Sequence, residues 1–224
     1  MYRGSLSELL SESWRFYLRH LKAIACIILP IALPFIALQN GFLGEDGKLS
    51  QDNYLLLTLV GIGLEPIYIA AVVLYIRAQL LGEPWSVGTC LRAGLKVWPQ
   101  LTLVVAFTLA MTLLGLGFFI LPGLVIASRL MFASLNCTLL RLPAWRAIQL
   151  SWKQTAPYAG MLLKAVIVMM ALVMLPFWLI HQHLLTSQAA SIWFYLNRAA
   201  GTLLEVYPLV FAYRCYSAMV EEAA

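Results

Sequence analysis

Three ionisable residues, Glu65, Arg129 and Glu205, lie near the middle of long apolar stretches of the sequence. Each stands 9 to 12 residues before a base that closes its stretch, which is about 14 to 18 Å along a helix. Two chemistries fit this set. The guanidinium of Arg129 bridges both carboxylates and locks the fold, or one carboxylate binds a proton, an ion or a polar head group along a transport path. If all three are ionised, the net charge of −1 leaves room for a cation.

Both glutamates also stand close to a proline, in Glu65-Pro66 and in Glu205-Val206-Tyr207-Pro208. A proline inside a helix frees a backbone carbonyl or bends the axis. The sequence therefore predicts two similar half-sites at disturbed helices. Arg198 lies seven residues before Glu205 and is expected to reach the outer membrane interface as an anchor.

Motifs for enzymatic or metal chemistry are missing from this sequence. It has no GxSxG, Walker or HExxH motif and only two aspartates. Its four cysteines form no CxxC pair, and its three histidines form no cluster with the spacing of metal ligands. We therefore expect no catalytic residue, no metal site and no cofactor.

The composition predicts an all-α membrane protein and excludes a soluble domain. Of the 224 residues, 62% are hydrophobic and 11% charged, and the mean hydropathy is +0.85. About 20 apolar residues cross a bilayer as a helix. The chain is expected to form one polytopic domain, 1–224, with no cleavable signal peptide. The six predicted spans are 23–42, 54–76, 101–121, 123–140, 158–180 and 191–213.

The third and fourth spans are separated by a turn motif, Leu121-Pro122-Gly123. Proline and glycine end helices, so the apolar block 101–140 is predicted to be a hairpin of two spans.

Basic residues predict the orientation. Twelve of the 15 lie before the first span, between the second and third, between the fourth and fifth, or at the end of the sixth. Lys and Arg near span ends stay in the cytoplasm, so both termini are expected there. The net charge of +5 then reflects this asymmetry, and no nucleic-acid partner is predicted.

Three amphipathic segments before spans, 4–21, 85–98 and 144–157, resemble one another. The triplets Ser13-Trp14-Arg15, Gly94-Leu95-Lys96 and Ser151-Trp152-Lys153 each combine a small, an apolar and a basic residue. The predicted architecture is three repeats of an interfacial helix and a transmembrane hairpin. The expected interfacial anchors are Trp14, Arg15, Lys96, Trp98, Trp152 and Lys153, with the lipid bilayer, and its anionic lipids at the cytoplasmic face, as the partner.

The stretch 118–123, Phe-Phe-Ile-Leu-Pro-Gly, followed by Arg129, Phe132-Ala133, Ala147 and Ser151, resembles the signature of YciC-like inner-membrane proteins of Gram-negative bacteria. A similar signature occurs in the membrane domain of some glycerophosphodiester phosphodiesterases. The resemblance covers essentially the whole chain and implies a multi-pass protein of the cell inner membrane without an assigned activity. The phosphodiesterases carry their catalysis in a separate barrel of about 250 residues, for which this chain has no room.

Two functions therefore remain open. One is a non-enzymatic structural or regulatory role in envelope or lipid homeostasis, as a homo-oligomer or beside another membrane protein. The other is a small transporter or channel with Glu65, Arg129 and Glu205 as its midplane site.

Overall fold

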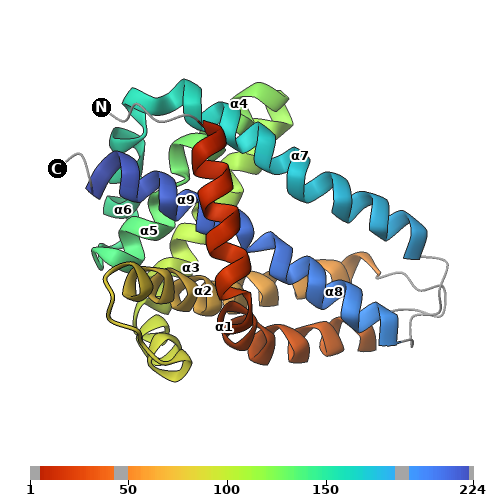
Figure 1. Cartoon of the computed structure of the whole chain (residues 1–224). Helices are drawn as coiled ribbons and strands as arrows, with labels where there is room; N and C mark the ends of the chain where they lie inside the picture. The colour runs from red at the N-terminus through yellow and green to blue at the C-terminus, as the bar shows by residue number, and fades with distance from the viewer. Residues whose placement is uncertain (1–5, 43–49, 185–191, 222–224) are drawn as a thin grey trace.

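The computed structural model describes residues 6–42, 50–184 and 192–221, and these residues contain helices and no strand (Figure 1). The helices are α1 (Leu6–Gly41), α2 (Gln51–Leu80), α3 (Val87–Phe118), α4 (Ile120–Leu130), α5 (Ala133–Leu139), α6 (Ala144–Gln154), α7 (Ala159–Leu184), α8 (Ile192–Glu205) and α9 (Tyr207–Tyr216). A 3₁₀ turn, η1 (Ala156–Tyr158), precedes α7, and a π-helical turn, η2 (Ser217–Glu221), follows α9.

Five segments within the described residues are long and apolar enough to cross a membrane: Leu6–Gly41, Gln51–Leu80, Val87–Phe118, Ile120–Leu139 and Ala156–Val173. The sixth predicted span, 191–213, is divided between α8 and α9, of 14 and 10 residues. The division falls at Val206, two residues before Pro208, which has no N–H to continue the helical bonding. The described residues are thus all-helical, with five segments long and apolar enough to span a membrane; one of these, Ile120–Leu139, is broken between α4 and α5.

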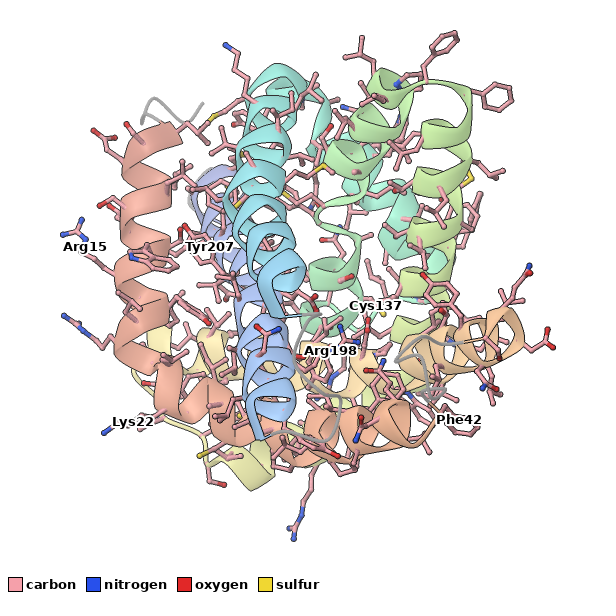
Figure 2. All side chains as sticks on the ribbon, turned by 90° about the vertical axis from the view of Figure 1, so that its right-hand side faces the viewer. Arg15, Lys22, Phe42, Cys137, Arg198 and Tyr207 are labelled. Carbon is pink, nitrogen blue, oxygen red and sulfur yellow. The ribbon has the colours of Figure 1, made fainter. Side chains whose placement is uncertain are left out.

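The first amphipathic segment and the first span form one helix. In Figure 2 the first part of α1 runs straight to Lys22 and the helix then turns sharply toward Phe42. The second amphipathic segment is likewise continuous with its span in α3. Only α6 is separate from the helix that follows it, because η1 lies between α6 and α7.

The reversal between α3 and α4 lies at Phe119, two residues before the predicted turn motif. Leu121, Pro122 and Gly123 belong to the first turn of α4, where proline is tolerated because its missing N–H would have no helical partner. Gly123 instead allows close packing: a Cβ on Gly115 would lie 2.8 Å from the Gly123 Cα. The motif therefore acts through the contact between the two helices.

Buried apolar side chains form two clusters. The larger includes Ile27, Ile76 and Phe211, and the smaller includes Leu101 and Val104; all five are fully buried. Large apolar side chains also cover the outside of the bundle, including Leu59, Leu103, Leu113 and Leu172, each at least 50% exposed. So much outward apolar surface is typical of a helical bundle solvated by lipid.

The beginning of α1 and the end of α9 lie on one side of the molecule (Figure 1). Arg214 Nη2 lies 2.7 Å from Glu12 Oε2, which joins these two elements. The far ends of α1 and α7 lie on the opposite side in the same view.

Candidate functional site

A cavity of about 200 Å³ lies between α1, α2 and α8. Its polar lining consists of Gln39 from α1, Glu65 and Tyr68 from α2, and Arg198, Thr202 and Glu205 from α8. Its apolar lining consists of Ile31, Ala32, Phe35, Ile36 and Leu64. The cavity therefore combines charged groups with one apolar wall inside the bundle.

The two carboxylates face this cavity without direct partners. Glu65 and Glu205 are close enough for their charges to interact. Neither has a hydrogen bond or an ion pair among the described residues. Glu65 is half-buried and Glu205 is exposed to the cavity. The pair is thus open to a ligand.

Arg198 is the base at this cavity. Its Nη2 donates to Gln39 Oε1 at 2.9 Å, and its charge acts on Glu205. Thr202 Oγ1 donates to the Arg198 carbonyl at 3.0 Å. Figure 2 shows Arg198 between α8 and the second part of α1. The sequence predicted that Arg198 anchors the helix at the outer membrane interface. In the structure Arg198 instead lines the cavity, where Gln39 of α1 accepts its hydrogen bond.

Arg129 lies outside the cavity. Its guanidinium carbon is 4.7 Å from the centre of the Trp152 ring, a cation–π geometry between α4 and α6. No hydrogen bond or ion pair joins it to Glu65 or Glu205 in the part of the chain that the structure describes. The bridge predicted from the sequence is therefore absent, because α4 packs on α6 and α7 whereas the carboxylates lie beside α1.

Arg129→Ala is expected to cost little stability. Its half-buried guanidinium contributes a cation–π contact worth about 0.5 to 2 kcal/mol, whereas a central bridge would contribute more. The measurement is the melting temperature in detergent, with Arg198→Ala as the matched comparison. Arg198→Ala should cost more because it leaves two acids facing the cavity without a base. A larger loss for Arg129→Ala than for Arg198→Ala would contradict this arrangement.

The small residues of the three triplets all contact a second hairpin helix or its continuation. Ser13 Oγ lies 3.3 Å from the Tyr207 hydroxyl, and Ser151 Oγ donates to the Arg129 carbonyl at 2.8 Å. A Cβ on Gly94 would lie 3.0 Å from the Ile67 carbonyl oxygen. Each contact thus falls within two residues of Glu205, Arg129 or Glu65, respectively.

A hydrogen-bond donor follows each small residue by four positions, on the same helix face. The Tyr17 hydroxyl donates to the Leu203 carbonyl at 2.9 Å, and Trp98 Nε1 donates to the Gly63 carbonyl at 2.6 Å. In the third triplet the donor is Thr155, which donates to the Arg129 carbonyl at 3.1 Å. The three amphipathic segments are therefore attached to their neighbours at comparable positions.

The predicted interfacial anchors are all exposed at the outer surface, the bases as well as the tryptophans. Trp14, Trp98 and Trp152 are 37 to 45% exposed, and Arg15, Lys96 and Lys153 are exposed. Each tryptophan also makes an inner contact: Trp14 packs on Tyr207 at 5.0 Å between ring centres, Trp98 donates to Gly63, and Trp152 lies against Arg129. No three His, Cys, Asp or Glu side chains among the described residues are grouped as a metal site would require.

Sequence reasoning did not identify Tyr68, Arg198 or Gln39 as cavity residues. Helical spacing could have found the first two, because Tyr68 follows Glu65 by three residues and Arg198 precedes Glu205 by seven. Gln39 comes from another helix and carries no such signal.

No family model, curated protein or solved structure matches this chain. The resemblance to YciC-like proteins therefore stays a prediction from the residues.

Proposed function

We propose that the chain is a non-enzymatic multi-pass protein of a bacterial inner membrane that acts as a small transporter or channel. The observation that carries this proposal is the cavity, in which Glu65 and Glu205 face open space instead of a bridging arginine. An ionisable residue inside a membrane bundle is typical of a substrate or ion pathway. The midplane site then consists of Glu65, Glu205 and Arg198.

The topology proposed with this function has six membrane-crossing segments in three units, with both termini in the cytoplasm. The comparable contacts of Ser13, Gly94 and Ser151 support three related units. The beginning of α1 and the end of α9 lie on one side, and the bases are in excess on one side of the spans; both observations support the even number and the orientation. The resemblance to the YciC-like family supports the location.

The second candidate is a structural or regulatory role in envelope or lipid homeostasis. Exposed Trp14 and Trp152 beside Arg15 and Lys153 favour it. Such pairs contact anionic lipid head groups, at about 1 kcal/mol for each base. This role requires a membrane surface and a neighbour, either a second copy of the chain or another membrane protein, and it does not require an open cavity.

Cysteine labelling distinguishes the two candidates. The variant Thr202→Cys in a Cys26→Ser background places one thiol in the cavity, since the other three cysteines are buried. In lipid nanodiscs we expect a small, positively charged methanethiosulfonate to label it, because a solute pathway admits the reagent to the carboxylates.

The matched control is Leu172→Cys, which is 50% exposed on the outer face of α7 and is expected to face lipid. It should stay unlabelled, since a charged reagent does not enter the hydrocarbon. Equal lack of labelling at both positions would reject the transporter and favour the structural role.

A further inference from the structure

We propose that the cavity binds an organic monocation, an ammonium group with an apolar body, whose charge lies at Glu65. This inference rests on the proposed function and specifies the class of substrate.

The charges of the cavity leave one carboxylate uncompensated. Arg198 acts on Glu205, whereas the charge that acts on Glu65 is that of Glu205, another acid. Arg198 is also held by Gln39 on the side of α1. When Glu65, Glu205 and Arg198 are all ionised, the cavity carries a net charge of −1, which a single positive charge at Glu65 neutralises.

An aromatic ring lies beside this carboxylate. A Cβ on Gly61 would lie 3.4 Å from Phe35 Cζ and 3.6 Å from Glu65 Oε1, so the ring edge and the carboxylate border the same small space. Aromatic rings pair edge to face, so this ring edge suits a ligand whose apolar body is itself aromatic. The adjoining side chains of Ile31, Ile36 and Leu64 form the apolar wall.

Tyr68 supplies an independent polar group. Its side chain is 8% exposed, it lines the cavity, and its hydroxyl has no hydrogen-bond partner among the described residues. This hydroxyl is therefore available to a ligand in the cavity. Because its oxygen accepts hydrogen bonds, it suits the N–H groups of an ammonium ligand.

The same surroundings suit a metal cation poorly. Hard cations take about six oxygen ligands, whereas this cavity combines its carboxylates with the positive charge of Arg198 and with five apolar side chains. An amphiphilic ammonium uses both the carboxylate and the carbon wall.

The test is saturation binding of radiolabelled benzylammonium to the whole protein in nanodiscs of zwitterionic lipid. We expect saturable binding to the wild type, at least tenfold weaker binding to Glu65→Gln, and no change for Glu83→Gln, whose carboxylate is exposed outside the cavity. Phe35→Leu keeps the charge but removes the contact between the Phe35 ring and the benzyl ring, and should weaken binding about threefold to tenfold. Benzyl alcohol, which has a similar shape without the charge, should not compete.

Competition by benzyl alcohol equal to that of benzylammonium would overturn the proposal, as would unchanged affinity in a folded Glu65→Gln variant. If Glu65→Gln does not fold, the proposal is tested by the affinity of Phe35→Leu and by the competition of benzyl alcohol with benzylammonium in the wild type. Displacement by sodium without any effect of Phe35→Leu would indicate an inorganic cation and reject the organic class. Absence of binding while Thr202→Cys is labelled would reject this ligand class alone; absence of labelling would reject the proposed function itself.

Discussion

Replacing Gly123 with alanine is expected to separate α3 from α4 and to lower the stability of the protein by about 1 to 3 kcal/mol. The added Cβ would lie 2.5 Å from Leu116 Cγ and 2.7 Å from the Leu116 backbone nitrogen. The backbone nitrogen cannot move without the helix, so the two helices must shift apart. The measurement is the melting temperature of the purified protein in mild detergent.

Gly117→Ala is the matched control on the same hairpin. A Cβ at Gly117 meets nothing within 4 Å. Alanine is a better helix former than glycine by about 0.5 to 1 kcal/mol, so this variant should be equally or more stable. If both substitutions changed the melting temperature alike, the close contact between Gly115 and Gly123 would be disproved.

This hairpin also shows what the sequence could predict about the fold. Apolar runs of spanning length predict where helices lie, because backbone groups in lipid must be satisfied within a helix. The position of the reversal, at Phe119, was not predictable from Pro122, since a proline fits either a turn or the first turn of a helix. The local sequence is compatible with either position of Pro122, and the close packing of Gly115 on Gly123 favours the first turn of α4.

The candidate site was predictable in part for a related reason. Charge and depth identify Glu65, Arg129 and Glu205 as residues that need an interior environment. Which of them share a space depends on how helices distant in sequence pack. Arg129 makes a cation–π contact with Trp152, whereas Arg198 of α8 donates a hydrogen bond to Gln39 of α1. These contacts between helices distant in the sequence could not be predicted from a single sequence.

The second large effect is expected for Ser151→Ala, with a loss of about 1 to 3 kcal/mol. The helical hydrogen bonding is interrupted between α4 and α5, which leaves backbone groups at this point without regular helical partners. Ser151 Oγ accepts from Phe132 N at 3.2 Å and donates to the Arg129 carbonyl at 2.8 Å. Because Ser151 is fully buried, alanine would leave the Phe132 N–H without a partner and without water.

Gln149→Ala on the same helix is the control, because Gln149 is exposed and should tolerate alanine. In Ser151→Ala the Thr155 hydroxyl, 3.1 Å from the Arg129 carbonyl, is still able to donate to it, so the loss should come mainly from the unpaired Phe132 N–H. Ser151→Thr keeps the hydroxyl and should recover part of the melting temperature if the extra methyl group is accommodated. Equal stability of Ser151→Ala and Gln149→Ala would mean that the break between α4 and α5 does not depend on this hydroxyl.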